Sequence, residues 1–528
     1  MNLINSSWIP VLREDGSSDI ISPLDLLDDS KENPVVEIHT VRPDFDCAVL
    51  QFLISLYQVL LSPEDEDDWR DFLDEPPTLS DLSSKVELLL PAFSFDEGEF
   101  RFMQDASVKD TDTWEIQKLL LDIDNTLFLK EGSIRHLCPR CAAMALLTLQ
   151  LNAPSGGRGH RTSLRGGGPL TTLVCLPSGK GTLWQNICLN IIPEDMFPSQ
   201  GDVSVSAEYL SSIFPWVGVV PNSENGDTAL PGNFHPYHVY WNIPRRVFLD
   251  FSSTDEGVCD VCGEQSDMRV SYYWSRPLGM NYDSSLWRHP FTPYWGKKDT
   301  LPLPHRPKED ELSYANWAGL IFGSASMGRN PASVVRTVSS LLRTDDEFSD
   351  LKIHVSGYIT DNAKVRAWEE GWLPLFSIPD SVKEAFESEI SMIIDTASWI
   401  SSILILMVKQ GLTGKPNLLK GDVPSIKSSF WNLTEQAFQQ VISKLPDVLM
   451  SGCDEKLFEM KMNWLSEVRR ISLGIFKEWV SYPVYGELNP KCAAKAEWEL
   501  SVSLLPSNAK LCKILGLPAP EKKKKVKQ

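Results

Sequence analysis

Apolar residues recur every three or four positions over most of the chain after Pro379, which is the spacing of one helix face. Four such stripes follow one another, from Val382 to Met407, Ile426 to Leu445, Leu457 to Trp479 and Ala494 to Leu505. Gly411 and Gly414 are expected to end the first helix. Four amphipathic helices with modest connections predict an antiparallel four-helix bundle over residues 376–515, with each stripe buried against the others.

The preceding part of the chain shows no such stripes. From Thr171 to about Trp372, short β-rich runs are broken by Pro and Gly, a pattern typical of a mixed α/β domain. The acidic run Pro63–Asp68 predicts a solvated helix start, because carboxylates favour a helix N-terminus. The predicted fold class is therefore α+β: a large mixed α/β domain over residues 1–375, the helical bundle, and a disordered basic tail over residues 516–528.

The chain has the features of a soluble cytoplasmic protein with no membrane association. The most apolar stretch, Ile390 to Val408, is interrupted by Asp395 and several serines and has helical spacing, so we interpret it as a core helix. The first eight residues lack the charged and apolar regions of a secretory signal. Ten cysteines in 528 residues are too few for a secreted disulfide scaffold.

The overall charge argues against general binding to nucleic acid. The chain holds 71 acidic and 50 basic residues, a net charge of −21, whereas phosphate binding needs local positive charge. One window departs from this balance: Gly132 to Pro193 contains no Asp or Glu. About eight would be expected there by proportion. Any nucleic-acid contact is therefore predicted in this window.

Two glycine-rich runs lie inside the acid-free window, from Ser155 to Arg161 and from Arg165 to Gly168. Glycine has no Cβ, so its backbone N–H groups can approach a ligand closely. Arg158, Arg161 and Arg165 offer forked donors to phosphates or base edges. The glycine spacing matches neither a Walker A loop nor a dinucleotide fingerprint. A loop that approaches nucleic acid is favoured, and a surface loop without a ligand is the alternative.

Two C-x-x-C pairs predict a structural zinc site. The spacing lets two thiolates of one turn bind a single tetrahedral ion, and four thiolates leave no open coordination position for catalysis. The predicted ligands are Cys138, Cys141, Cys259 and Cys262. Two unrelated pairs of free cysteines are the alternative. The eight histidines form no hydrolase or deaminase signature, and His235 and His238 are interpreted as ordinary loop residues, so we expect a protein that is not an enzyme.

In these motifs the chain resembles the CasA family, the large subunit of the type I-E CRISPR Cascade surveillance complex. The matches include Asn2–Ile4, Phe102–Gln104, Asn125–Phe128, both cysteine pairs, the glycine loops and Leu286–Pro290. The resemblance implies a subunit of an antiviral ribonucleoprotein complex that contains crRNA and other Cascade subunits. Such a subunit recognises the protospacer-adjacent motif (PAM) in double-stranded target DNA and helps open the duplex for crRNA pairing and R-loop formation. It also docks the helicase-nuclease recruited afterwards.

The resemblance also implies roles for particular residues in minor-groove reading, where several weak contacts must combine. The family's glycine loop corresponds to Ser155, Gly156, Gly157, Arg158 and Gly159, followed by Arg161. Arg158 stands where a family member has glycine, a difference that would change the preferred motif. A second loop near DNA begins at Phe128, and the nearest cation to the family's basic finger is Arg276.

A hairpin is predicted where Ile353, Val355 and Gly357 alternate with polar neighbours before a turn at Asp361 and Asn362. In the family a glutamine at this tip is a wedge that splits the first base pair, and Asn362, with Asp361 beside it, stands at that position. Plain turn residues are the alternative. Two other functions stay open at this point: a zinc-dependent hydrolase and a purely structural ribonucleoprotein scaffold.

Overall fold

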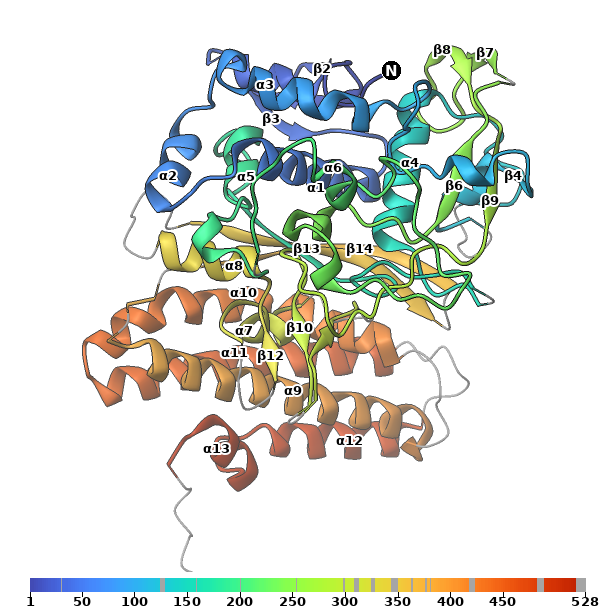
Figure 1. Cartoon of the computed structure of the whole chain (residues 1–528). Helices are drawn as coiled ribbons and strands as arrows, with labels where there is room; N and C mark the ends of the chain where they lie inside the picture. Colours follow the sequence, from blue (N-terminus) through green and yellow to red (C-terminus); the bar gives the residue numbers. More distant parts are fainter. Residues whose placement is uncertain are drawn as a thin grey trace, which may run out of the picture. The chain divides into compact units, whose positions relative to one another are not determined.

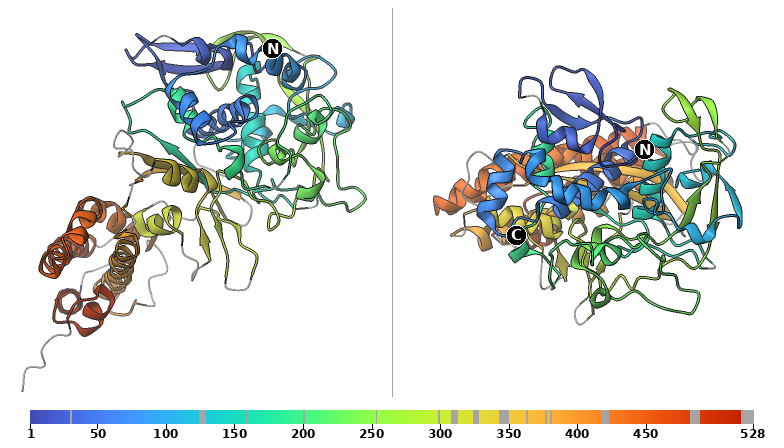
Figure 2. Two further views of the ribbon diagram at one scale, coloured as in Figure 1. Left: turned by 60° about the vertical axis from the view of Figure 1, so that its left-hand side comes forward. Right: turned by 45° about the horizontal axis from the view of Figure 1, so that its top comes forward.

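The computed structural model describes residues 1–29, 31–123, 129–157, 159–199, 201–252, 254–297, 300–307, 313–323, 328–342, 350–361, 364–375, 378–379, 381–416, 423–481 and 489–518. The chain forms two compact units (Figures 1 and 2). The first comprises Met1–Lys308 and Gly323–Phe376, and the second comprises Glu309–Phe322 and Ser377–Gln528.

Helix α1 (Pro43–Leu61) forms the core of the first unit, and nearly all of its side chains are buried. Pro43 in its first turn and acidic residues beside it suit a helix N-terminus. The helix lies between two three-stranded sheets, of strand order β2-β1-β3 and β14-β13-β5 (Figures 1 and 2). Because both sheets cover it, the helix is buried on every face, including its polar residues Gln51, Ser55 and Gln58.

The strands and helices around this core are short. The N-terminal sheet consists of β1 (Ile9–Arg13), β2 (Ser18–Ile21) and β3 (Val35–Ile38), all antiparallel. Smaller elements are α2 (Glu66–Asp74), α3 (Leu79–Leu89), α5 (Leu183–Cys188), α6 (Leu210–Ile213), α8 (Ser333–Leu341), β10 (Tyr294–Trp295), β11 (Leu303–Pro304) and β12 (Arg329–Asn330). The acidic run begins α2 as predicted, because the Asp65 carboxylate accepts the N–H groups of Asp67 and Asp68.

Helix α4 (Pro139–Asn152) packs on α1 beside a third sheet. That sheet has the order β4-β9-β6, with β4 (Thr113–Glu115), β9 (Tyr272–Arg276) and β6 (Arg246–Leu249). A separate hairpin, β7 (Asp255–Val258) and β8 (Gln265–Arg269), precedes β9. The core of this unit is rich in aromatic rings in edge-to-face contact, including Phe52, Phe93 and Trp241.

The predicted hairpin is confirmed as β13 (Lys352–Asp361) and β14 (Lys364–Pro374). The strands are in register from Lys352 opposite Pro374 to Asp361 opposite Lys364, with an irregularity after Ile359. The first half of β13 also pairs with β5 (Thr171–Cys175), and Ile353 and Val355 are fully buried there. The hairpin is therefore anchored in the core at one end and free of β5 at the other.

The second unit contains a helix at each of the four predicted stripes: α9 (Lys383–Thr413), α10 (Val423–Met450), α11 (Asp454–Ser481) and α12 (Pro490–Ser503). These helices pack on one another, and α13 (Ala509–Leu515), which periodicity missed, packs on α9. Gly414, in the left-handed conformation at φ +69°, ends α9, whereas Gly411 lies inside it. Helix α7 (Trp317–Ile321) belongs to this unit although it precedes residue 376, and Trp317 packs against Phe386 and Phe438.

The prediction that each stripe is buried is wrong at Leu433 and for most of the fourth stripe. Leu433 is 55% exposed, Trp498 65% and Val502 40%. Ala494 is exposed as well, and α12 instead buries Ala496 and Leu500. These two residues lie on the opposite side of the helix, so the fourth stripe is its solvent-facing side.

Two helices, α1 and α9, are long and apolar enough to cross a membrane by length and composition alone. In the most apolar window of α1, 89% of the residues are buried inside the protein, against 50% for α9. Core helices of soluble proteins meet the same criterion, and the burial of α1 is that of a core helix.

Candidate metal centre and glycine-loop surface

Four cysteines from two distant segments converge at the N-terminal end of α4. The sulfurs of Cys138, Cys141, Cys259 and Cys262 all lie within 4.8 Å of one another. Those of Cys138 and Cys262 are 3.9 Å apart. A tetrahedron of thiolates around zinc places its sulfurs about 3.8 Å apart. The donor set and its spacing therefore fit one tetrahedral metal ion.

The local backbone explains why each cysteine pair forms a knuckle. Cys138 is the N-cap of α4, and its sulfur accepts the Cys141 N–H at 3.4 Å. On the other segment, Gly263 adopts φ +74°, which lets its N–H donate to the Cys259 carbonyl at 2.9 Å. The Cys138 N–H also donates to the Cys259 sulfur at 3.3 Å. N–H groups that point at sulfur favour the thiolate, the form that binds metal.

Backbone hydrogen bonds hold the two knuckles together independently of any ion. The Asp260 carboxylate accepts the N–H groups of Arg135 at 2.7 Å and His136 at 2.8 Å. The Asp260 N–H donates to the His136 carbonyl at 3.0 Å, and Leu137 pairs with Val270 in an isolated β-bridge. An ion would therefore enter a prearranged site.

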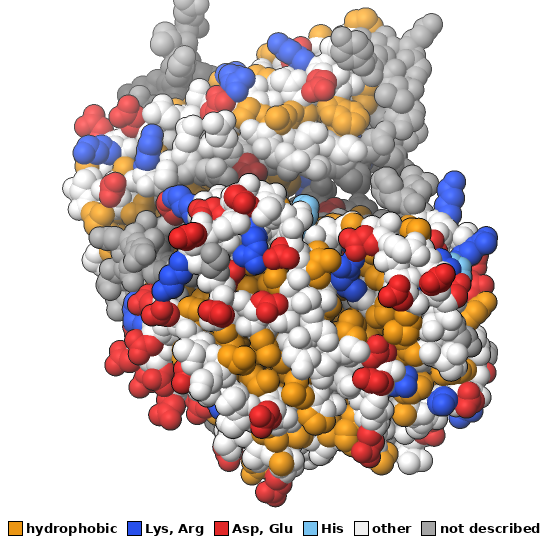
Figure 3. Space-filling model, turned by 90° about the horizontal axis from the view of Figure 1, so that it is seen from above, with side chains coloured by type: hydrophobic (Ala, Val, Ile, Leu, Met, Phe, Trp, Pro, Cys, Tyr) orange, Lys and Arg blue, Asp and Glu red, His pale blue; other side chains and the backbone are white. Residues whose placement is uncertain are grey.

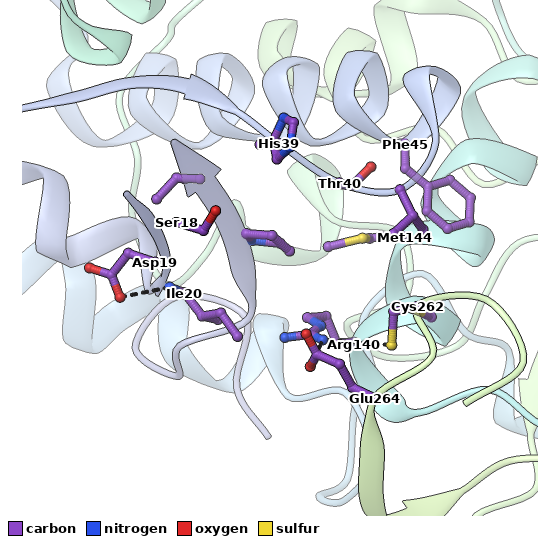
Figure 4. Close-up of a pocket in the computed structure, with 14 residues that line it drawn as sticks. Ser18, Asp19, Ile20, His39, Thr40, Phe45, Arg140, Met144, Cys262 and Glu264 are labelled. Atoms are coloured by element: carbon purple, nitrogen blue, oxygen red, sulfur yellow. Dashed lines mark hydrogen bonds and ion pairs between the residues drawn. The ribbon is translucent and has the colours of Figure 1, made fainter. Parts of the chain in front are cut away.

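A cation faces the exposed side of the cluster. Arg140 forms an ion pair with Glu264, and its Nη2 lies 3.7 Å from the Cys262 sulfur (Figure 4). A cavity of about 350 Å³ adjoins this group, with Phe45 and Met144 on its apolar side. Hydrogen bonds among the four sulfurs lower the pKa of Cys259 and Cys262 and raise the pKa of Cys138 and Cys141, so without an ion the four groups share protons. Four thiolates this close repel one another, and a divalent cation would remove that repulsion.

The first glycine run follows the C-terminal end of α4 and forms an exposed loop. Ser155, Gly156 and Gly157 are exposed, and a Cβ placed on Gly157 would meet no atom within 4 Å. Gly157 and Gly159 have φ of +69° and +84°, a conformation that favours glycine. Their N–H groups donate to no other group in the described part of the chain. The open part of the loop is therefore the backbone at Gly157, followed by the N–H group of Gly159.

The base of the loop is packed. A Cβ on Gly159 would lie 2.7 Å from Leu278 Cδ2. Arg161 Nε donates to Ser223 Oγ at 3.0 Å, and Arg245 Nη2 donates to the Pro154 carbonyl at 2.5 Å. These contacts hold both ends of the loop and place two cations beside it.

Arg165 is not a ligand-facing donor, which corrects the expectation from sequence. Its side chain is fully buried and donates to Thr292 Oγ1 at 2.7 Å, Gln51 Oε1 at 2.6 Å and Thr171 Oγ1 at 2.7 Å. Burial lowers the pKa of Arg165 to about 10. Because neutral oxygens accept hydrogen bonds from its guanidinium group, Arg165 connects buried segments of the protein interior.

The remaining predicted contacts lie at the ends of strands. Arg276 is exposed at the end of β9. Asp361 is half-exposed at the end of β13 and forms an ion pair with Arg366 at 2.9 Å. Phe128, Arg158 and Asn362 lie outside the described residues.

The second glycine run connects the loop to the hairpin. A Cβ on Gly167 would lie 3.0 Å from the Ser155 nitrogen, and a Cβ on Gly168 would lie 3.3 Å from Thr360 Cγ2. Only glycine allows these backbones to approach so closely. The buried Gly166–Gly168 run therefore packs between the start of the loop and the outer end of β13.

Helix α4 separates the cysteine cluster from the glycine loop. With 14 residues the helix spans about 21 Å, so an ion at its first turn cannot touch the loop after its last. From the second knuckle, β8 and β9 lead to Arg276. Two segments of the chain thus run from the cysteine cluster to the loop: α4 is one, and β8 with β9 is the other. They come into contact where the Leu278 N–H donates to the Gly159 carbonyl at 2.8 Å.

His235 and His238 are core residues rather than loop residues. Both are buried at a short 3-10 helix, Pro236–Tyr240, and His238 Nε2 lies 3.1 Å from Tyr282 Oη. Burial lowers the pKa of His238 to about 3. Neutral histidines packed in this way among aromatic rings support no role in catalysis.

The negative charge is concentrated in one part of the first unit. The first hundred residues contain 23 acidic and 5 basic residues, a net charge of −18 out of −21. Figure 3 looks onto the face formed by β2, β3 and α3, where acidic side chains are spread widely and gather along one border. The remainder of the chain is close to neutral, so the acid-free window does not have to overcome the whole net charge.

Sequence reasoning missed Leu278, Ser223 and Arg245, which hold the base of the loop. Leu278 carries no motif, and its φ of +64° is a conformation that leucine rarely adopts. A Pro-Leu-Gly turn shortly after the aromatic run Tyr272–Trp274 was the available signal.

The fold and the site define a large α+β protein with a four-cysteine knuckle and an appended helical unit. A family model of the CRISPR-associated protein Cse1 matches residues 2–475, and the chain belongs to this family. This confirms the resemblance to CasA that the motifs indicated.

Solved structures of this family share the fold at low identity. The chain is 18% identical to Thermus thermophilus CasA (Cse1), with a TM-score of 0.69 and coverage of 96% of this chain and 100% of that one. Thermobifida fusca Cse1 is 16% identical, with a TM-score of 0.69 and coverage of 98% of this chain and 98% of that one. A chain in a structure of a CRISPR RNA-guided surveillance complex is 13% identical, with a TM-score of 0.68 and coverage of 96% and 99%.

Proposed function

We propose that the chain is the non-catalytic large subunit of a cytoplasmic type I-E Cascade complex, and that it recognises the PAM of double-stranded target DNA through the minor groove. Membership of the Cse1 family and the likeness in fold to a chain of a surveillance complex support the assembly. The observation that carries PAM recognition is the open tip at Gly157, whose backbone is exposed inside the acid-free window.

The glycine loop would contact the groove by its backbone. The minor groove is narrow, and the backbone of Gly156 and Gly157, which lack Cβ atoms, can enter it where a side chain would collide. The free N–H groups of Gly157 and Gly159 suit the acceptors on the groove floor. Arg161 and Arg276 supply positive charge at the edge of the loop, where phosphate contacts would fix the register. Arg158 and the loop from Phe128 are further proposed contacts.

The acidic N-terminal face would direct how DNA approaches. A net charge of −18 in the first hundred residues repels phosphate, whereas the window around the glycine loop does not. Long-range repulsion of this kind raises the share of encounters in which the duplex meets the loop.

The hairpin end would take part in opening the duplex. The buried Gly168 packs against Thr360, next to Asp361, so a duplex held by the loop would pass close to Asp361 and Asn362. The Asp361 carboxylate is already paired with Arg366, which limits its repulsion of phosphate. Opening would let crRNA pair with the target strand in an R-loop, after which a helicase-nuclease docks on the subunit.

Zinc is the proposed ion of the cysteine cluster. Cys138, Cys141, Cys259 and Cys262 would hold it with no open position, so it would cross-link two segments without activating water. The knuckle would therefore be structural, which argues against a zinc-dependent hydrolase.

Replacing Gly157 by leucine in the assembled complex tests PAM recognition. Gly179 is the matched control, because it too is exposed, has a positive φ of +76° and meets nothing within 4 Å. Both variants introduce the same side chain and the same backbone strain, but only Gly157→Leu blocks the loop tip. We expect Gly157→Leu to reduce the preference for PAM-bearing duplex at least ten-fold, and Gly179→Leu to leave it unchanged.

The measurement is the dissociation constant for duplexes with the preferred motif and with a randomised one. If the Gly157→Leu complex discriminates as well as its parent, the loop assignment is wrong. If the parent binds every member of a motif library equally, the chain is a structural scaffold of the ribonucleoprotein and does not read DNA.

A further inference from the structure

Leu278 occupies a strained position at the base of the glycine loop. Its φ of +64° is in the left-handed region, which is unfavourable for a residue with a Cβ. Such strain persists only where the surrounding structure determines the conformation, and it concentrates at functional sites. The surroundings of Leu278 meet this condition.

Both backbone groups of Leu278 are bonded to other segments. Its N–H donates to the Gly159 carbonyl at 2.8 Å, and its carbonyl accepts the Ser223 N–H at 2.9 Å. Its side chain packs on Gly159, where any Cβ would collide with Cδ2 at 2.7 Å. The leucine is thus a junction between the glycine loop and the segment around Ser223.

The residues around Leu278 pack closely on the turn. A Cβ on Gly279 would lie 2.1 Å from the Pro244 carbonyl oxygen, so the chain passes there in direct backbone contact. Ser223 Oγ donates to the Gly279 carbonyl at 2.8 Å and accepts from Arg161 Nε at 3.0 Å. This ring of contacts joins the end of the loop to the turn after β9.

The turn also sets where Arg276 stands. Arg276 is the last residue of β9, two positions before Leu278, and it is exposed. Helix α4 leads away from the cysteine cluster on one side, and strands β8 and β9 lead away on the other. A displacement of α4 relative to β9 would therefore be largest at the ends that lie far from the cluster. The hydrogen bond from the Leu278 N–H to the Gly159 carbonyl joins these far ends and limits that displacement.

We propose that Leu278 is a positioning residue that fixes the glycine loop relative to Arg276 and so sets how strongly the subunit discriminates the PAM. This role rests on the proposed function. The strained backbone holds the loop base while Gly157 at the tip stays open, so the groove meets a preorganised surface. Discrimination needs this arrangement, whereas non-specific phosphate attraction does not.

Three variants separate the contributions in the assembled complex. Leu278→Gly removes the side-chain contact and allows many backbone conformations. Leu278→Asn removes the contact but tolerates the left-handed conformation. Leu301→Gly is the control, since Leu301 is 59% exposed elsewhere in the same unit. Each complex is tested for affinity to duplexes with and without the motif, and for hydrogen–deuterium exchange in the described loop residues 155–157 and 159–161.

For Leu278→Gly we expect loop exchange to accelerate at least ten-fold and PAM preference to fall at least ten-fold. Its affinity for duplex without the motif should stay within two-fold of the parent. Leu278→Asn should keep most of the PAM preference and most of the protection of the loop from exchange. Leu301→Gly should match the parent in both measurements.

Two results would overturn the proposal. One is unchanged loop exchange in Leu278→Gly, which would show that the residue does not hold the loop. The other is an equal loss of affinity for all duplexes, which is the signature of general unfolding. If the parent complex itself shows no motif preference, the proposed function fails, and the exchange measurement alone then decides whether Leu278 positions the loop.

Discussion

Replacing Cys259 by serine removes one ligand from the proposed zinc site and leaves the backbone bonds between the two knuckles in place. Serine is not ionised at neutral pH and binds zinc poorly, so the remaining three thiolates would hold the ion weakly. Cys138 and Cys259 are 121 residues apart in the sequence. The ion therefore closes a long loop of the chain.

Two separate arguments give the size of the effect. If zinc stays bound in the unfolded chain, a cross-link closing a loop of this length stabilises the folded state by about 5 kcal/mol. If zinc binds only the folded chain, free zinc at a thousand times its dissociation constant contributes about 4 kcal/mol. Both routes predict that Cys259→Ser lowers the free energy of unfolding of the first unit by roughly 4–5 kcal/mol.

The assay combines metal content with urea unfolding at a fixed concentration of free zinc. Circular dichroism follows the transitions, and hydrogen exchange of α4 assigns one of them to the first unit. Cys453→Ser is the control, because Cys453 belongs to the second unit and is not one of the four clustered cysteines. We expect one zinc ion per parent chain, none in Cys259→Ser, and no change in Cys453→Ser. A Cys259→Ser protein that retains its zinc, or that loses it while its unfolding free energy stays within about 1 kcal/mol of the parent, would refute this reasoning.

Three further predictions concern buried charges. Arg165→Met leaves Gln51 Oε1 and nearby oxygens without a donor and should cost about 3 kcal/mol in thermal unfolding; an unchanged melting temperature would show that the network contributes nothing. Burial raises the pKa of Asp46 to about 6 from 3.8, so the folded state favours the neutral acid and the parent loses stability as pH rises from about 4 to 6. Asp46→Asn should therefore be more stable than the parent at pH 8 by up to about 3 kcal/mol, and a difference that persists at pH 3.5 would contradict the assignment. Lys461→Met leaves the Glu389 carboxylate, 2.5 Å from Lys461 Nζ, buried without its cation, which should cost about 3–5 kcal/mol; adding Glu389→Leu should recover most of that loss in a double-mutant cycle.

Local physics made the helical unit predictable. The stripe from Val382 to Met407 is one face of a long helix, and periodicity depends only on neighbours within two turns. The exposure of Trp498 could not be predicted in the same way, because apolar residues lie on both faces of α12 and the neighbouring helices decide which face is buried.

The site was predictable as separate pieces. Each cysteine pair has metal spacing by itself, and the glycine run at 155–159 marks a close-approach loop. That the two pairs share one cluster depends on the path of the chain between them. The interior position of Arg165 was likewise hidden, since a glycine-flanked arginine has the same local sequence whether it faces solvent or a buried amide.

Chemistry that resides in a residue and its immediate neighbours was readable from the order of the amino acids: helix periodicity, thiolate pairs, the missing carboxylates and the turn-forming glycines. Contacts between remote segments required the folded backbone. Leu278 has no intrinsic preference for the conformation it adopts, and the bond to Gly159 compensates for its strain only once α4 and β9 have been brought together. Interactions over more than a hundred residues are selected by the packing of the whole unit, which no short window of sequence contains.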